Sequence, residues 1–337
     1  MTSEKREILY NLEKEYVEQL INGRDTSSVL GELNTITSKI CVDFQEKAVN
    51  SIHVLIKLSS EVYFDSSFLK SATLIEPSSL TDLVTEQDFF QAKEFVSDLL
   101  RVDLENVGFL SLSKQVRNNA EGFCVSCCDE KHHVFIQNDQ FGVVSKDLLV
   151  HELGHAADFT ISRSIDNDNL LVKHSSISEA VAYYCQYKYL LECSEKHRRI
   201  GAFGAFLLTY LSICILRYCL ENDTPLNEIT PEIAVNDEQF SNIVNSYGHE
   251  GRDFVVGKIH MLKEQHKELG SLVYNEISPR FGMVLALKLL DKTVEEIVEI
   301  IQINSIDNDL AQIVEKISSP TDNGFGSVQN HFEDFFG

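Results

Sequence analysis

Two histidines and a glutamate lie close together in HELGH, residues 151–155. On a helix, His151 and His155 lie one turn apart and about 40° apart around the axis, so both imidazoles can bind one metal ion. Glu152 is rotated by about 100° from His151, which puts its carboxylate beside such an ion rather than on it. A carboxylate in that place can act as a general base on metal-activated water. The segment therefore predicts a metal-dependent hydrolytic site.

A catalytic zinc ion takes three protein ligands and leaves one position open. No histidine stands six residues after His155, where the chain has Ile161. The segment SSISEAVAYY, residues 175–184, instead predicts a helix with Glu179 near its start, in an otherwise apolar stretch. A buried carboxylate needs a partner, and a metal ion supplies one. We therefore predict one Zn²⁺ per chain, held by His151, His155 and Glu179.

Other interpretations of these residues remain open. The two histidines can lie by chance on an amphipathic helix, although a chance HExxH is expected only about 0.03 times in a chain of this composition. Glu179 can be a solvated acid that the helix dipole favours. Glu192 and Glu195 are alternative third ligands, in a more polar and basic stretch. Asp158, one turn beyond His155, can orient an imidazole.

Helices and a small sheet must position these residues. Before residue 105 the apolar residues recur at helical spacing, and Thr81 or Thr85 can cap a helix that runs to Leu100. Three short β-like runs then precede the HELGH segment: VGFLSLS at 107–113, GFCVSCC at 122–128 and HHVFIQ at 132–137. We expect a mainly α (α+β) fold in which a small β-sheet, with an edge strand, packs on the active-site helix within a largely helical chain.

HELGH, followed by ExxA 24 residues after His155, resembles the gluzincin peptidases. The spacing is most similar to the thimet-oligopeptidase and oligoendopeptidase F group, over about 60 residues from 130 to 190. The resemblance implies a zinc metallopeptidase, largely helical around a deep cleft, with Glu152 as general base. It also implies that HVFIQ, residues 133–137, is the edge strand that pairs with an extended peptide.

The resemblance extends more weakly to a distal region. YGHEG at 247–251 and YNEISPRFGMVLALKLL at 274–290 are similar to the segment that gives a tyrosine or histidine to the oxyanion. Tyr247, His249 and Tyr274 are therefore candidate catalytic residues, with packing as the alternative role. The aspartate that some gluzincins place four residues after the ligand glutamate is Tyr183 here, and the GAMEN exopeptidase motif is absent. Endopeptidase or oligopeptidase action is thus expected.

The chain divides into four predicted regions. A helical N-terminal region, 1–105, precedes a zincin-like catalytic core at 106–200 with the sheet, the HELGH helix and the Glu179 helix. A helical C-terminal region, 201–319, completes the cleft, and 320–337 is predicted to be a loose tail. The cysteines and histidines of 124–133 permit a second, structural metal site. Half-buried thiols on a strand are the favoured interpretation, because no second CxxC exists.

Composition and charge restrict the partners. The 337 residues are 43% hydrophobic and 24% charged, with 5 prolines and a formal net charge of −23. So acidic a surface repels phosphate backbones and anionic lipid, so we expect a peptide or protein substrate, with no nucleic acid and no membrane. The uncharged stretch 200–216 is 17 residues long, and we interpret it as a buried core helix rather than a membrane span.

The expected location is the cytoplasm. The opening segment MTSEKREILYNLEKEY lacks the apolar core of a secretory signal, and most of the 8 cysteines lie in apolar helical patterns typical of reduced thiols. Non-classical secretion, as for an injected effector, is the alternative. Two other functions compete with a soluble peptidase. One is a catalytically weak or inactive zincin scaffold that acts as a protein-binding module; the other is a membrane-embedded protease that uses 200–216.

Overall fold

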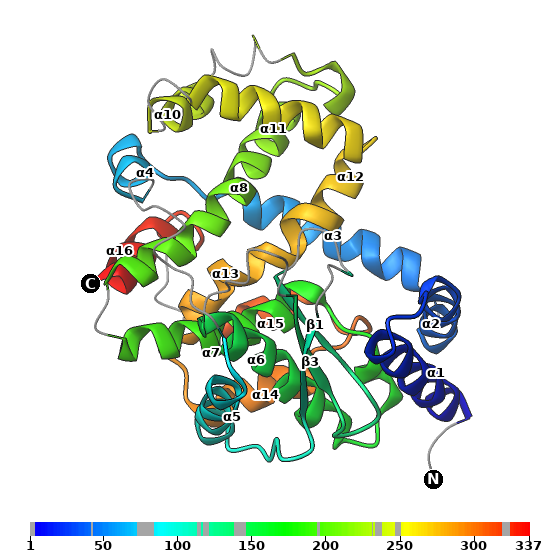
Figure 1. Cartoon of the computed structure of the whole chain (residues 1–337). Coiled ribbons are helices and arrows are strands. Elements are labelled where there is room, and N and C mark those ends of the chain that lie inside the picture. Colours follow the sequence, from blue (N-terminus) through cyan, green and yellow to red (C-terminus); the bar gives the residue numbers. More distant parts are fainter. Residues whose placement is uncertain are drawn as a thin grey trace.

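The computed structural model describes residues 4–41, 43–72, 84–112, 116, 121–137, 146–193, 196–230, 232, 238–246, 251–318 and 324–337. Most of these residues are helical (Figure 1). The helices are α1 (Glu4–Ile21), α2 (Ser27–Ile40), α3 (Phe44–Ser60), α4 (Ser66–Ala72), α5 (Glu86–Leu100), α6 (Lys146–Arg163), η2 (Asp168–Leu171), α7 (Ser175–Glu192), α8 (Lys196–Glu221), η3 (Leu226–Glu228), α10 (Glu238–Ser246), α11 (Gly251–Gln265), α12 (Leu269–Leu272), the π-helix η5 (Val273–Ile277), α13 (Ser278–Leu289), α14 (Val294–Ile303), α15 (Leu310–Ile317) and α16 (Val328–Phe336).

Three short strands form one mixed sheet in the order β1-β3-β2. Strand β1 (Gly108–Leu112) pairs in parallel with β3 (His133–Gln137), and β2 (Gly122–Val125) pairs with β3 in antiparallel. The predicted mainly helical fold with a small sheet is therefore confirmed. Thr85 caps α5, as one of the two predicted alternatives, and its hydroxyl accepts a hydrogen bond from the Asp88 N–H.

The prediction that residues 133–137 form the edge strand is wrong. Strand β3 is central, because β1 and β2 occupy its two sides, and β2 forms an edge of the sheet. The physical reason lies in the run Val134, Phe135 and Ile136, all fully buried. Consecutive apolar residues are typical of a strand that is covered on both faces, whereas an exposed edge strand alternates. The edge beside the candidate site therefore belongs to β2.

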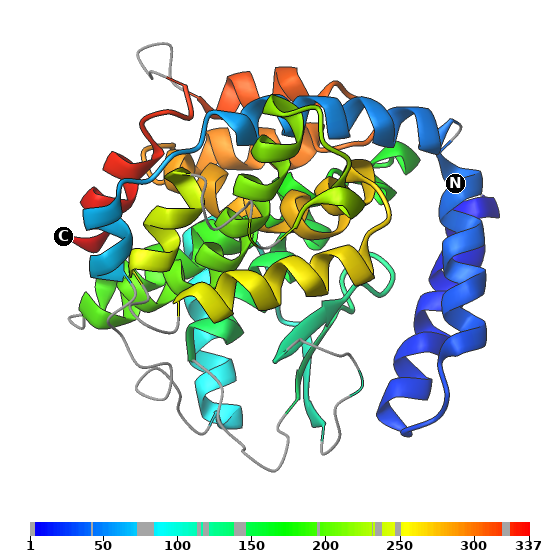
Figure 2. The same ribbon diagram turned by 90° about the horizontal axis from the view of Figure 1, so that it is seen from above.

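Two helical layers cover the two faces of the sheet. On one face, Phe123 and Phe135 pack with Tyr16 and Leu20 of α1. Val134, on the opposite face, belongs to the main core, together with the apolar side of α6. Figures 1 and 2 both show α1 and α2 side by side at one end of the molecule, next to the strands. Among the described residues, the side of β2 away from β3 thus faces the space between α6 and the α1–α2 hairpin.

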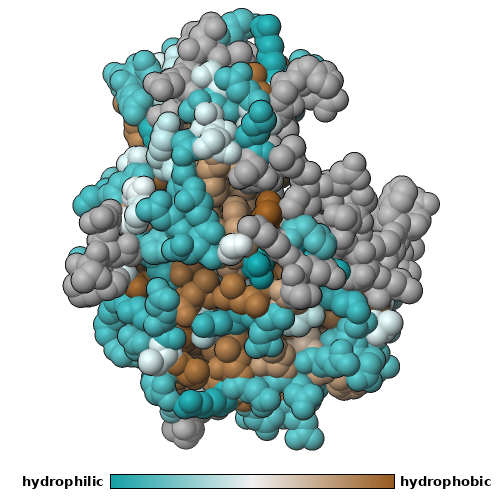
Figure 3. Space-filling model, turned by 90° about the vertical axis from the view of Figure 1, so that its left-hand side faces the viewer, coloured by the Kyte–Doolittle hydropathy of each residue, from teal (hydrophilic) through white to brown (hydrophobic). Residues whose placement is uncertain are grey.

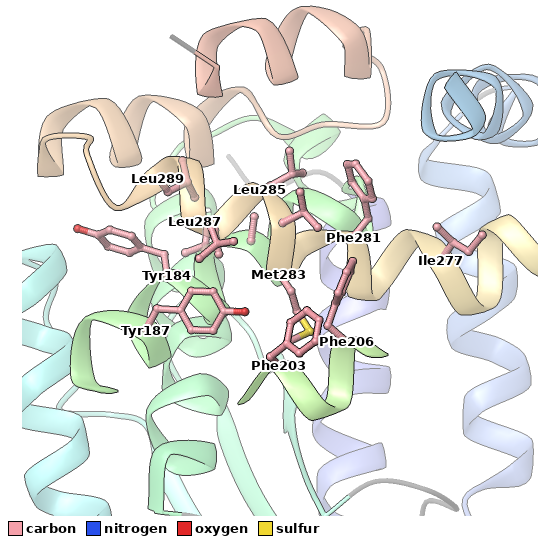
Figure 4. Close-up of a cluster of buried hydrophobic side chains, with 14 of the residues drawn as sticks. Tyr184, Tyr187, Phe203, Phe206, Ile277, Phe281, Met283, Leu285, Leu287 and Leu289 are labelled. Carbon is pink, nitrogen blue, oxygen red and sulfur yellow. The ribbon is translucent and has the colours of Figure 1, made fainter. Parts of the chain in front are cut away.

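The long apolar helix α8 lies largely within the protein. Over His197–Glu221 this helix is long and apolar enough to span a membrane, and it is the single such helix among the described residues. However, 65% of its apolar window is buried inside the protein. Phe203 and Phe206 pack there with α13 residues such as Met283 (Figure 4). On the face drawn in Figure 3, apolar residues gather in the central and lower part and are bordered by hydrophilic ones.

The prediction of a loose tail at 320–337 is also wrong for its described part. Residues 328–336 form α16, and Phe332 is fully buried with its ring centroid 4.8 Å from that of Phe203. Its apolar residues recur at helical spacing, which lets one face of α16 pack on α8 and α13. The main hydrophobic cluster extends from Leu55 to Phe336, so all four predicted regions contribute to it.

Candidate metal centre

Helix α6 carries the HELGH segment across the middle of its length. Leu149 and Leu153 anchor its buried side and are fully buried. His151 and Glu152 are 8% and 6% exposed, and both line a cavity of about 600 Å³. The sequence periodicity predicted one helix with both histidines on the same side. The structure has this arrangement.

The three predicted ligands come together. Nε2 of His151 lies 3.4 Å from Oε2 of Glu179, and Nε2 of His155 lies 3.6 Å from Oε1 of the same carboxylate. Ligand atoms of the three residues all lie within 4.8 Å of one another, and no other such group of three occurs in the described part of the chain. These residues can hold one metal ion.

The spacing of these atoms tests the fit to a metal. Charged N–H···O hydrogen bonds are about 2.7–2.9 Å long, so 3.4 and 3.6 Å are long for direct bonds. In a tetrahedral zinc site, with bonds of about 2.0–2.1 Å, neighbouring ligand atoms lie about 3.3 Å apart. The two observed distances, each to a different oxygen of the Glu179 carboxylate, are close to that separation. The donor set of two imidazoles and one carboxylate also suits zinc.

Electrostatics favour a charged carboxylate at this point. Burial raises the pKa of Glu179, but the neighbouring His155 and His151 outweigh burial and hold its pKa well below the usual range. For His155 the effects are reversed: burial lowers its pKa, but the negative charge of Glu179 and then of Glu152 raises it to about 9. The site thus concentrates negative charge around the imidazoles, which is what a divalent cation needs.

Close helix contacts place Glu179 opposite the histidines. A Cβ atom on Gly154 would lie 2.7 Å from Cα of Ala182, so α6 and α7 approach each other at backbone distance. In a second close approach, a Cβ atom on Gly282 of α13 would lie 2.5 Å from Cβ of Glu179. Helix α7 therefore packs closely against both α6 and α13, with no room for a larger side chain at either glycine.

A buried amide fixes the start of α7. Asn304, fully buried at the end of α14, accepts a hydrogen bond from the backbone N–H of His174 at 3.1 Å. Its Nδ2 donates to Oγ of Ser178 at 3.1 Å. The hydroxyls of Ser175 and Ser278 lie 2.9 Å apart and join α7 to α13. These contacts hold the turn just before Glu179.

The cavity extends from the predicted metal ligands along α6. Phe159 and Arg163, one and two turns beyond His155, line it together with residues 122–126 of β2 and the following turn. The α1–α2 hairpin supplies the opposite wall through residues such as Leu33. Two ion pairs sit here, Arg163 with Glu13 at 2.7 Å and Lys173 with Asp158 at 2.9 Å.

The sequence prediction did not anticipate the contacts that these neighbours make. Tyr183 packs against His151 with ring centroids 4.4 Å apart, edge to face. Its position four residues after Glu179, on the same side of α7, was the available signal. Asp158 binds Lys173, and the pairing of Glu13 with Arg163 joins residues 150 positions apart, which no local pattern reveals.

Of the three candidate oxyanion donors, the structure describes Tyr274, which is not assembled with the predicted ligands. Tyr247 and His249 lie outside the described residues. Tyr274 lies in η5, is 43% exposed, and is not among the residues that line the cavity. A catalytic role for the three residues stays a prediction.

The cysteine and histidine run beside the sheet adopts another arrangement. Nδ1 of His132 accepts a hydrogen bond from the Cys127 N–H at 3.0 Å, and burial lowers the pKa of this histidine to about 2. Cys127 is buried, and Cys124 and Cys128 are half-buried. The described residues of this run form no group that could hold a metal.

Comparisons with known proteins give one distant structural similarity. No protein-family model matches the chain, and no curated protein matches it. Among solved structures, the chain is similar to a crystal structure of a candidate peptidase from Chlamydophila abortus, with 13% identity and a TM-score of 0.48. The match covers 98% of this chain but 60% of that one, so the chain spans three fifths of the length of that protein. A likeness of this size does not determine the activity.

Proposed function

We propose that this protein is a zinc metallopeptidase of the gluzincin type, acting as an endopeptidase or oligopeptidase. One observation carries the proposal: Nε2 of His151 and of His155 lie 3.4 and 3.6 Å from the carboxylate of Glu179, close to the spacing of ligands around tetrahedral zinc. The carboxylate of Glu152 follows directly in the same cavity. Two of the proposed ligands come from α6 and one comes from α7, so the side of the site that faces the cavity is left open for a substrate.

Each residue has a defined role in this proposal. His151, His155 and Glu179 hold the ion. Bound zinc supplies a Lewis acid that polarises a peptide carbonyl and lowers the pKa of water. Glu152 accepts a proton from the attacking water and delivers it to the leaving amine. Tyr247, His249 or Tyr274 donates a hydrogen bond to the developing oxyanion.

The edge of β2 supports a peptide as the substrate. The N–H of Gln137 donates to the carbonyl of Glu121 at 2.8 Å, which fixes the phase of the antiparallel ladder. The backbone N–H and C=O groups of Gly122 therefore point away from β3, on the side of the strand that lines the cavity. An extended peptide can add to this edge as a further strand, next to the metal ligands.

Metal analysis paired with mass spectrometry of cleaved peptides tests the proposal, with the Glu152→Gln protein as the blank. We expect one zinc per chain, lost in His151→Ala, and cleavage that falls by at least about 10²-fold in Glu152→Gln. Equal cleavage by the parent and Glu152→Gln would show that Glu152 is not the base. Bound zinc with no cleavage of any peptide would favour the alternative, an inactive zincin scaffold that binds proteins.

A further inference from the structure

The direction of β2 relative to α6 determines which end of the strand lies at which end of the cavity. At one end, a Cβ atom on Gly122 would lie 3.3 Å from Cδ2 of Leu148, in the first turn of α6. At the other end, Oγ of Ser126 donates to Glu13 at 2.9 Å, and Glu13 binds Arg163 in the last turn of α6. Strand β2 and helix α6 therefore run side by side in the same direction.

The cavity continues from His155 toward the Ser126 end. Beyond the ligands it is lined by Phe159 and Arg163, which follow along α6. Leu9, Leu33 and Leu171 line the same cavity and belong to a cluster that also includes Cys128, two residues after Ser126. The apolar part of the cavity thus lies on one side of the metal ligands, near the end of β2.

Helix α2 presents one stripe to this space. Leu30, Leu33 and Thr37 are spaced at three and four residues and all line the cavity. Leu30 is 37% exposed, so an apolar surface is available to a ligand. The charges nearby are already balanced within the protein, since Arg163 binds Glu13 and Lys173 binds Asp158. What this side offers a substrate is therefore apolar contact.

The polarity of a bound peptide follows from the strand. Antiparallel pairing is somewhat more stable per residue than parallel pairing. A peptide antiparallel to β2 has its carboxyl-terminal part near Gly122 and its amino-terminal part near Ser126. Its amino-terminal part then lies against the stripe of Leu30, Leu33 and Thr37.

We propose that the space between α2 and α6 is a subsite for a bulky apolar side chain on the amino-terminal side of the cleaved bond, with Leu33 as its main specificity-determining residue. This inference rests on the proposed peptidase function. The α1–α2 hairpin would then contribute to the choice of substrate. Discrimination of about 10- to 100-fold between a leucine-sized side chain and a small polar one is the scale expected for burying such a side chain.

The test uses the full-length, zinc-loaded protein and a peptide library randomised on both sides of the cleaved bond. We expect enrichment of Leu, Met or Phe on the amino-terminal side. Leu33→Lys should shift that preference toward Asp and Glu by about tenfold or more, because it places a charge in the subsite. Ile8→Lys is the matched control, since Ile8 lies on the same hairpin, is 44% exposed and does not line the cavity.

Binding to the Glu152→Gln protein separates the two hypotheses. Calorimetry compares peptides that differ only by Leu or Ser at the selected position. A preference on the carboxyl-terminal side, or one unchanged by Leu33→Lys, overturns the subsite and leaves the peptidase proposal standing. Selective binding without cleavage overturns the peptidase proposal and retains the subsite; neither cleavage nor selective binding overturns both.

Discussion

A Cβ atom on Gly282 would lie 2.5 Å from Cβ of Glu179, closer than two such carbon atoms can pack. It would also lie 2.7 Å from the backbone nitrogen of Ala180. Helix α13 is therefore the support against which Glu179, the proposed third metal ligand, is held. A residue outside the proposed ligand set thus determines where this carboxylate lies.

Substitution Gly282→Ala should weaken metal binding without removing a ligand. The added methyl group must push α13 away from α7 and move Glu179, at a cost of about 1–3 kcal/mol in the free energy of unfolding. Zinc titration should show at least about tenfold weaker affinity. Gly257→Ala, in α11, is the control: nothing lies within 4 Å of the added atom, and alanine is up to about 1 kcal/mol better than glycine in a helix. Unchanged zinc affinity in Gly282→Ala would contradict the support role.

Zinc affinity should rise with pH between about 7 and 9. The pKa of His155 is raised to about 9 by Glu179 and Glu152 against burial, so at pH 7 the metal must displace a proton. Each pH unit up to about 9 should then strengthen the apparent affinity by up to about tenfold, with a plateau above. Calorimetry in buffers of different ionisation enthalpy measures the released proton. Absence of proton release at pH 7 would show that His155 is neutral before the metal binds.

The same pKa shift sets the pH dependence of the metal-free fold. The pKa of His155 in the folded protein lies above the usual histidine value of 6.5, so protonation stabilises the native state. This contribution is fully present below about pH 6.5 and is lost as the pH rises through about 9. Urea unfolding of the metal-free protein at several pH values measures it. A His155→Gln protein should lack this component.

Tyr183 should support His151 through its ring and not its hydroxyl. The two rings meet edge to face with centroids 4.4 Å apart. Tyr183→Phe keeps this contact and should leave zinc affinity within about twofold, whereas Tyr183→Ala should weaken it by about 10- to 100-fold, the range for residues that orient a ligand. A large loss in Tyr183→Phe would instead assign the role to the phenol.

Removing one member of the pair between Glu13 and Arg163 should destabilise the protein strongly. Both side chains are 5% exposed, and Glu13 also receives hydrogen bonds from Ser126 and the Cys128 N–H. Glu13→Ala leaves a buried guanidinium without its anion, at about 3–5 kcal/mol. The double variant Glu13→Leu, Arg163→Met should recover much of that loss, as urea unfolding can show. Equal stability of Glu13→Ala and the parent would mean that water replaces the carboxylate.

The local parts of the fold and site were predictable from the sequence. Helical spacing placed His151 and His155 on one side of α6, and an acid in an apolar helix located Glu179. The three β-like runs became the three strands. Each of these signals lies within a short window, where period and residue type determine the local conformation.

The other features depend on contacts that short windows do not encode. The order of the strands was missed, although the unbroken apolar run Val134–Ile136 was a signal for a central strand. The helix at 328–336 carries apolar residues at helical spacing, but polar turns before it hid the pattern. Asn304, which holds the turn before Glu179, is 125 residues away in the chain and looks like any polar residue at a helix end.

The bond between Glu13 and Arg163 has a consequence for biosynthesis. Helix α1 is synthesised before α6, so its buried Glu13 has no Arg163 to bind until another 150 residues have followed. Contacts so distant along the chain form slowly, because a long loop has to close first. Until then the cavity lacks one wall, and a nascent chain can close it only after α6 is complete. In the nascent chain, the contact that joins the α1–α2 wall to α6 therefore becomes available only once residue 163 has emerged.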